Sequence, residues 1–195
     1  MNVSEWSGGE TTQIAIYPEN KKYKDRNFIW RLSSATVDID SSVFTKLEDY
    51  NRIIMVLGGK LELNHNDKEI VYLNEFDQNE FDGANDTTTV GKCIDYNLMM
   101  KKGQCTGKIK TLTIPANNML NHQLINGFSS YKNFTLGIYS YNSSLDLSVE
   151  DLIGASLNQG DFLLLNFSNK IGSVRIGINN PYDKDAVVVI TQIFY

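Results

Sequence analysis

Two arginines stand in stretches that otherwise have the apolar character of β-strands. Over residues 28–35, the alternation of a strand places Arg31 and Ser33 on one face and Trp30 on the other. Arg52 opens a second apolar stretch. A guanidinium binds a carboxylate through two parallel hydrogen bonds, so two arginines beside one cavity would suit a small acidic ligand. The alternative is that both are surface or salt-bridged arginines.

Polar residues also share one face of the stretch over residues 95–99. Alternation puts Asp95, Asn97 and Met99 on the same side of a strand. Asp95 could orient an arginine, or it could be a residue of a strand end. Asp82 and Asp95 form the one attractive carboxylate pair for general acid–base chemistry, which would need one raised pKa and a close geometry.

A third polar segment lies near the N-terminus, over residues 6–14. Its two consecutive glycines allow a close approach of the backbone, and Thr11, Thr12 and Gln13 follow with hydrogen-bonding side chains. The segment could close a binding site, or it could be an entry loop before the first strand.

Metal and nucleophile chemistry has little support in the sequence. A transition-metal site needs about three protein ligands, and the chain has only two histidines, His65 and His122, 57 residues apart. We expect His65 to be a solvated turn residue. The motifs of nucleophile elbows, phosphate-binding loops and dinucleotide sites are absent. We therefore expect no metal and no cofactor.

The composition is that of an ordinary globular protein of 195 residues, with 42% hydrophobic and 21% charged residues. A net charge of −5 disfavours nonspecific nucleic-acid binding. No apolar run approaches the ~20 residues of a membrane helix, and no secretory signal is visible, so we expect a cytoplasmic protein with no membrane partner. Cys93 and Cys105 are then expected to be reduced thiols rather than one disulfide.

Short stretches rich in β-branched and aromatic residues recur along the chain, with turn residues between them, and predict an all-β sandwich or barrel. The exception is a predicted helix at residues 148–157. Leu-Asn-Glu-Phe-Asp at 73–77 resembles Leu-Asn-Gln-Gly-Asp at 157–161. This repeat favours a duplication, with barrels over residues 1–105 and 106–195.

Taken in order, several segments of the chain resemble the HutD/Ves family, a cupin-like group linked to histidine utilisation in bacteria. The matching segments are residues 6–14 (Trp-Ser-Gly-Gly-Glu-Thr-Thr-Gln-Ile), 28–35 (Phe-Ile-Trp-Arg-Leu-Ser-Ser-Ala), 44–45 (Phe-Thr), 49–52 (Asp-Tyr-Asn-Arg), 58–59 (Gly-Gly), 81–83 (Phe-Asp-Gly) and 95–99 (Asp-Tyr-Asn-Leu-Met). The resemblance implies two cupin-like barrels (double-stranded β-helix, or jelly roll) in one chain and no metal site. It also implies binding of a small pathway acid such as formylglutamate or urocanate.

Together, these observations predict a non-enzymatic protein that binds a small acidic metabolite in its first barrel, with a regulatory role in histidine utilisation. The expected ligand-binding residues are Thr11, Thr12, Gln13, Trp30, Arg31, Ser33, Arg52, Asp82, Asp95, Asn97 and Met99. Trp30 would wall the pocket, the arginines would bind the acid, and the acidic residues would hold the arginines. The alternatives are a metal-independent cupin enzyme and a carbohydrate-binding β-sandwich. A homodimer is one assembly that the sequence allows.

Overall fold

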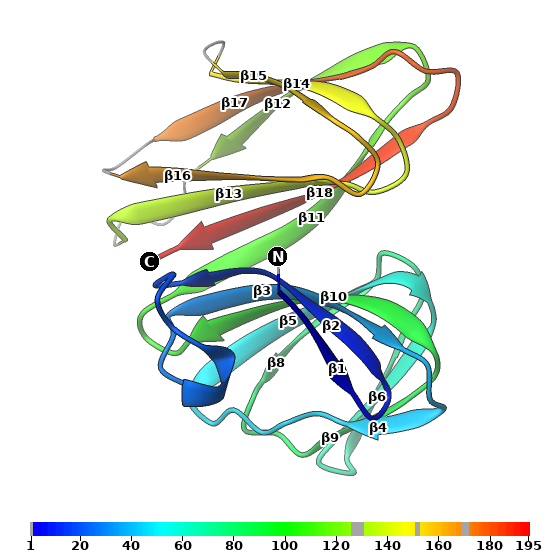
Figure 1. Ribbon diagram of the computed structural model, residues 1–195, viewed down its shortest axis with the longest axis vertical. Coiled ribbons are helices and arrows are strands. Elements are labelled where there is room, and N and C mark those ends of the chain that lie inside the picture. Colours follow the sequence, from blue (N-terminus) through cyan, green and yellow to red (C-terminus); the bar gives the residue numbers. More distant parts are fainter. Residues whose placement is uncertain (1, 126–130, 151–152, 169–171) are drawn as a thin grey trace. The chain divides into compact units, whose positions relative to one another are not determined.

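The computed structural model describes residues 2–125, 131–150, 153–168 and 172–195, and these residues form antiparallel strands almost throughout (Figure 1). The chain divides into two compact units, of which the first ends at Thr106 and the second begins at Gly107. A short 3-10 helix, η1 (Tyr23–Asp25), interrupts the strands of the first unit. In the described residues, no helix is long and apolar enough to cross a membrane.

The first unit is built from a six-stranded and a four-stranded sheet. The larger sheet has the order β1 (Asn2–Trp6), β2 (Gly9–Tyr17), β3 (Trp30–Val37), β10 (Cys93–Lys101), β5 (Tyr50–Gly59) and β8 (Gln78–Asp82). The smaller sheet has the order β4 (Ser41–Val43), β9 (Thr87–Val90), β6 (Leu61–His65) and β7 (Glu69–Leu73). The central strands of the larger sheet are therefore β3, β10 and β5, which come from distant parts of the sequence.

The described residues of the first unit include two apolar clusters. The larger cluster includes Ile54, Val56, Leu63 and Phe81, and the smaller one is centred on Phe28 and its neighbours. Alternation along the strands places Ile54 and Val56 of β5 and Leu61 and Leu63 of β6 in the larger cluster, while Ile53 and Met55 of β5 are buried on the opposite face of the sheet. Met99 of β10 belongs to the smaller cluster and Cys93 of the same strand to the larger one, so the polar residues between them lie between two apolar regions.

His65 lies inside the first unit, and the prediction of a solvated turn residue is wrong. Its side chain is 2% exposed. The two ring nitrogens are hydrogen-bonded to Thr87 Oγ1 at 2.9 Å and Asn79 Oδ1 at 3.0 Å, and the ring packs against Phe81. As the last residue of β6, it continues the inward alternation of Leu61 and Leu63, which the turn residues that follow it obscure in the sequence.

The second unit also consists of two sheets. One has the order β11 (Thr106–Ile114), β18 (Ala186–Phe194), β13 (Asn133–Ser140) and β16 (Phe162–Ser168). The other has the order β12 (Asn118–Ile125), β17 (Ser173–Asn180), β14 (Leu145–Val149) and β15 (Ile153–Leu157).

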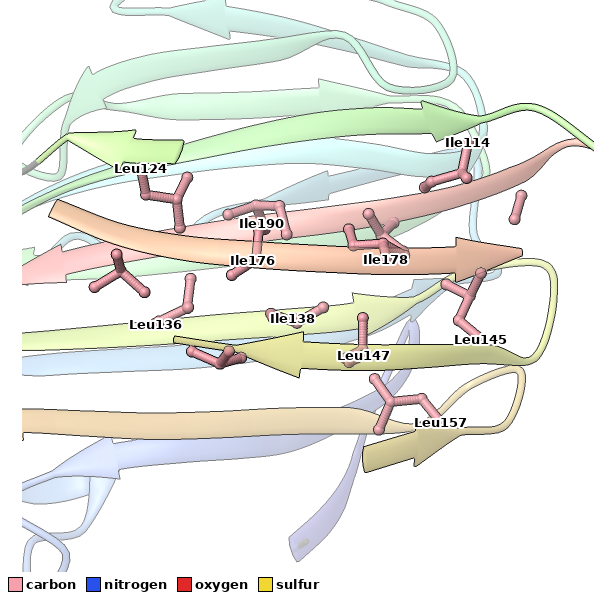
Figure 2. Packing of buried hydrophobic residues seen from close by; sticks show 14 of the residues in the cluster. Ile114, Leu124, Leu136, Ile138, Leu145, Leu147, Leu157, Ile176, Ile178 and Ile190 are labelled. Carbon is pink, nitrogen blue, oxygen red and sulfur yellow. The ribbon is translucent and has the colours of Figure 1, made fainter. Parts of the chain in front are cut away.

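The space between the sheets of the second unit is filled by aliphatic side chains. Figure 2 shows Leu136 and Ile138 of β13 in the same cluster as Ile176 and Ile178 of β17. In the described residues, every buried arginine and aspartate lies in the first unit and none in the second.

The predicted helix at residues 148–157 is wrong. Over the described part of this stretch, β14 and β15 pair as an antiparallel hairpin, and residues 151–152 lie outside the described residues. Leu145, Leu147 and Val149 are buried while Asp146 is exposed, which is the period of a strand. Ser148, the predicted N-cap residue of the helix, lies within strand β14.

The repeated five-residue segment forms the same turn in both units. Asp77 Oδ2 accepts hydrogen bonds from the Asn74 backbone N–H at 2.9 Å and its amide at 3.2 Å. Asp161 Oδ2 accepts the equivalent bonds from Asn158 at 2.8 and 3.1 Å. The residue before each aspartate has a left-handed backbone: Phe76 (φ 66°) and Gly160 (φ 86°). The presence of the same turn in both units supports the duplication that the sequence repeat indicates.

Candidate functional site

A pocket of about 280 Å³ opens in the first unit, beside the polar residues of the larger sheet. It is lined by the central strands β3, β5 and β10, by the β1–β2 hairpin, by residues 42–45 and by Tyr23 of η1. The volume is at the small end of ligand-binding cavities, which suits a metabolite of few atoms.

Strand register brings the two arginines into one row. Met99 of β10 pairs with Arg31 of β3 on one side and with Arg52 of β5 on the other. In a sheet, directly opposite residues project to the same face, so all three side chains point into the pocket. Asn97 and Asp95 follow at alternate positions of β10 and line the same pocket.

The glycine pair near the N-terminus holds the β1–β2 hairpin against β3. Gly9 has φ 149°, and a Cβ atom at this position would collide with the Thr36 carbonyl oxygen. The Asp38 backbone N–H donates to the Gly8 carbonyl at 2.8 Å. This close approach, which only glycine permits, fixes a hairpin whose Trp6 and Thr11 line the pocket.

Arg31 is buried, but its guanidinium is well supplied with partners. Its Nε donates to Gln13 Oε1 at 3.0 Å and its Nη1 to Ser33 Oγ at 2.9 Å. Its Cζ lies 4.4 Å from the centre of the Tyr23 ring, a cation–π distance. Burial lowers the pKa of Arg31, against the opposing effects of Tyr23 and Asp95.

Arg52 is also buried, but its guanidinium has fewer partners than that of Arg31. It is 4% exposed, and its Cζ lies 4.4 Å from the ring centre of Phe44 and 5.3 Å from that of Phe81. Its Nε has no hydrogen-bond partner, and within the described part of the chain no carboxylate forms an ion pair with it. Burial lowers the pKa of Arg52 to about 10; Tyr23 and Asp95 act in the opposite direction, and the nearby Arg31 lowers this pKa further. At neutral pH it is a charged group whose Nε–H has no acceptor.

Asp95 is the buried carboxyl group of the site, with 4% exposure. Burial raises its pKa to about 7, and this effect exceeds the opposing effects of Arg52, of the Ala35 backbone N–H and of Arg31. This carboxyl group is therefore protonated more readily than an exposed aspartate. Two guanidinium groups and at most one carboxylate leave the pocket with net positive charge, which favours an anionic ligand.

Asn97 is the second pocket residue with an unsatisfied polar atom. Its side chain is 4% exposed, and its Oδ1 has no hydrogen-bond partner. Such a group costs about 1–3 kcal/mol when it is left unpaired in a protein interior. Arg52 Nε and Asn97 Oδ1 are thus an unpaired donor and an unpaired acceptor on two residues that line the same pocket.

The predicted site residues separate into three groups in the structure. Those that line the pocket are Thr11, Arg31, Ser33, Arg52, Asp95, Asn97 and Met99. Gln13 does not line it but supports Arg31 from behind. Thr12, Trp30 and Asp82 lie elsewhere, so three of the predicted residues need correction.

Trp30 and Thr12 face away from the pocket. Trp30 is the residue before Arg31 in β3, so its side chain projects to the opposite side of the sheet, where it stacks on Tyr17 with ring centres 6.0 Å apart. Thr12 is displaced in the same way relative to Thr11. The alternation that places Arg31 in the pocket excludes Trp30 from its wall.

Asp82 does not hold either arginine. It ends β8, where it accepts a hydrogen bond from Lys102 Nζ at 2.6 Å and another from the Ala84 backbone N–H at 2.8 Å. These bonds lower its pKa, as expected for an ionised surface carboxylate. Because Asp82 lies outside the pocket that contains Asp95, the acid–base pair of the enzyme alternative is not formed.

Several pocket residues carry no chemical signal of their own in the sequence. Tyr23 and Phe44 cover the two guanidinium groups, and Trp6, Ser42 and Thr45 add to the lining. Phe44 and Trp6 stand in the segments that carry the HutD/Ves resemblance, which is the available clue. Among the described residues, no three His, Cys, Asp or Glu side chains gather in a way that could hold a metal ion.

Solved structures show which class of protein this fold defines. The chain is similar to a conserved protein of unknown function from Pseudomonas aeruginosa PAO1, with TM-score 0.79, 21% identity, and 98% and 93% of the two chains covered. It is also similar to HutD from Pseudomonas fluorescens SBW25, with TM-score 0.69, 18% identity and coverage of 100% and 94%. The chain is similar in the same way to an oxalate decarboxylase from Lactobacillus farciminis, with TM-score 0.68 and 8% identity; 99% of this chain and 83% of that chain are covered. The chain has a cupin-like fold with two barrels.

The family follows from the sequence itself. The HutD family model matches residues 1–175, so the chain belongs to the HutD family. It is thereby a cupin protein associated with histidine utilisation. Among curated proteins, no sequence matches this chain.

Proposed function

We propose that the pocket of the first barrel binds a small metabolite through its carboxylate, and that the protein is a ligand-responsive regulator in histidine utilisation rather than an enzyme. Formylglutamate and urocanate are the metabolites we would test first. Binding would take place in the cytoplasm.

The observation that carries this proposal is the unpaired Nε of the Arg52 guanidinium. A buried charge without a partner is strongly unfavourable, and proteins usually pair such groups. Here the unpaired Nε of Arg52 belongs to a residue that lines a cavity of suitable size. A carboxylate in that cavity would supply both the missing acceptor and the missing negative charge.

The different partners of the two arginines also support the proposal. Arg31 already donates to Gln13 and Ser33 and is covered by Tyr23, so its orientation is fixed before a ligand arrives. Arg52 is held by the aromatic faces of Phe44 and Phe81, which do not accept a hydrogen bond in the plane of its guanidinium. Arg31 would add positive charge to the pocket, while Arg52 would form the direct contact.

Calorimetric titration of formylglutamate, urocanate and glutamate into the wild-type protein and Arg52→Met tests the proposal. We expect at least one acid to bind the wild type, and Arg52→Met to weaken that binding at least a hundredfold. Arg175→Met removes the same charge from a largely exposed arginine of the second unit and should leave binding unchanged. The proposal fails if none of the acids binds the wild type, or if Arg52→Met binds as tightly.

A further inference from the structure

His65 is a polar residue in the apolar interior of the first unit. Leu61 and Leu63, on the same face of β6, are buried in the larger apolar cluster. A leucine at position 65 would continue that packing, whereas an imidazole has to be paired to be tolerated there. In the neutral ring, Nε2 donates to Asn79 Oδ1, which can only accept, and Nδ1 accepts from the Thr87 hydroxyl. These two bonds fix the orientation of the ring.

The partners of His65 come from both sheets of the first unit. Thr87, in β9 of the smaller sheet, lies directly opposite His65, and its backbone carbonyl accepts a hydrogen bond from the Phe44 N–H at 2.9 Å. Asn79, in β8 of the larger sheet, precedes Phe81 by two residues and lies on the same face of the strand. One imidazole therefore links the two segments that carry Phe44 and Phe81.

The rings of His65, Phe81 and Phe44 form a row beside Arg52. The ring centres of His65 and Phe81 are 4.7 Å apart, and those of Phe81 and Phe44 are 6.2 Å apart. Arg52 Cζ lies 4.4 Å from the ring centre of Phe44 and 5.3 Å from that of Phe81, the residue directly opposite Arg52 in the sheet. Arg52 Nε has no hydrogen-bond partner, and no carboxylate in the described part of the chain forms an ion pair with Arg52. The two phenylalanine rings are therefore its main supports.

We propose that His65 is a positioning residue of the site: by fixing Phe81 and Phe44, it holds the Arg52 guanidinium in the orientation that binds a carboxylate. His65 does not line the pocket, so it acts on the guanidinium through the two rings. Its role in binding rests on the proposed function, whereas its effect on the position of Arg52 does not.

A set of variants distinguishes positioning from packing. His65→Leu removes both hydrogen bonds and keeps an apolar side chain in place, while His65→Gln retains an amide N–H that can donate to Asn79 Oδ1. Leu61→Ala is the control, because Leu61 is 3% exposed, belongs to the same cluster and lies about 13 Å from His65 along the strand. Asn79→Ala breaks the link from a half-buried position and replaces His65→Leu if that variant does not fold.

The Nε–Hε signal of Arg52 in a nitrogen–proton correlation spectrum reports the position of the guanidinium without a ligand, because the ring currents of Phe44 and Phe81 displace it. Arg52→Met identifies the signal by removing it. We expect the signal to shift in His65→Leu, to lie nearer its wild-type position in His65→Gln, and to stay in place in Leu61→Ala.

Calorimetry with formylglutamate and urocanate then tests the role in binding. We expect His65→Leu to bind an acid about ten times more weakly than the wild type, the low end of what loss of an orienting group costs at metal sites. Leu61→Ala should bind as tightly as the wild type, although both variants lower Tm.

The inference is overturned if the Arg52 signal keeps its wild-type position in His65→Leu, or in Asn79→Ala where that variant replaces it. Equal changes of signal or affinity in Leu61→Ala would also overturn it, as would an unchanged affinity of His65→Leu for an acid that binds the wild type. If neither acid binds the wild type, the proposed function fails, and the spectrum still decides whether His65 positions Arg52.

Discussion

Removing the charge of Arg52 should stabilise the ligand-free protein, whereas removing that of Arg31 should destabilise it. Both side chains are buried in one pocket and point from strands that flank β10, so Met is an equivalent replacement at the two positions. They differ in their partners. Arg31 makes two hydrogen bonds to side chains, and the Nε of Arg52 makes none.

The expected change in the free energy of unfolding for Arg52→Met follows from the lowering of the pKa of Arg52 to about 10. Each pKa unit corresponds to about 1.4 kcal/mol, so charge burial costs roughly 3 kcal/mol. This cost is fully present at pH 7, because pH 7 lies below the pKa in both the folded and the unfolded chain. The cation–π contacts with Phe44 and Phe81 stabilise the buried charge by about 0.5–1 kcal/mol each, and so offset part of this cost. Arg52→Met should therefore gain about 1–2 kcal/mol.

For Arg31→Met, hydrogen bonds from a charged donor to Gln13 and Ser33 are lost, each worth about 1.5–3 kcal/mol. Even after the relief of charge burial, we expect a net loss of about 1–2 kcal/mol. Thermal and urea unfolding of both variants at pH 7 measure the difference. We expect Tm to rise by a few degrees for Arg52→Met and to fall for Arg31→Met. Equal destabilisation of the two variants would refute the reasoning, because Arg52 would then have a partner in solution.

Three further predictions concern the pocket and the cysteines. Arg52→Lys keeps the charge but loses the planar fork, so calorimetry should show carboxylate binding weaker by about 1–3 kcal/mol; unchanged affinity would contradict a bidentate contact. Burial raises the pKa of Asp95 to about 7, well above its unfolded value, so its contribution to stability is present at acidic pH and is lost as the pH rises through 7. Asp95→Asn should therefore unfold at a higher urea concentration than the wild type at pH 8, with a smaller difference at pH 5; a difference independent of pH would contradict this. Cys93 and Cys105 are buried free cysteines with raised thiol pKa values, so a thiol reagent should react slowly with the native protein and count two thiols in denaturant. A count near zero in denaturant would show that the cysteines are oxidised.

Strand alternation makes much of the site predictable from sequence. A charged or amide residue at an inward position of an apolar strand is costly, so the strand pattern alone singles out Arg31, Arg52, Asp95 and Asn97. The strand pairing that places Met99 between the two arginines cannot be predicted in this way, because it joins strands that are distant in the sequence. The two-residue alternation of a strand predicts the face on which a side chain lies, but it does not predict which strands pair with that strand.

The errors have physical causes of the same kind. A large aromatic residue such as Trp30 suits the wall of a pocket, but the alternation of β3 directs it to the other face. Tyr23 and Phe44 reach the guanidinium groups from segments outside the long strands, and no local period indicates such contacts. The turn of residues 73–77 is recognisable because an aspartate that caps its own backbone leaves a short local signature.

A crystal structure of the protein with bound N-formylglutamate or urocanate tests the central claim most directly. The account predicts density in the pocket of the first barrel, with a ligand carboxylate within hydrogen-bond distance of the Arg52 guanidinium. It also predicts that Arg31 keeps its bonds to Gln13 and Ser33. Ligand density confined to the outside of this pocket, or an Arg52 side chain turned out to solvent, would contradict the account.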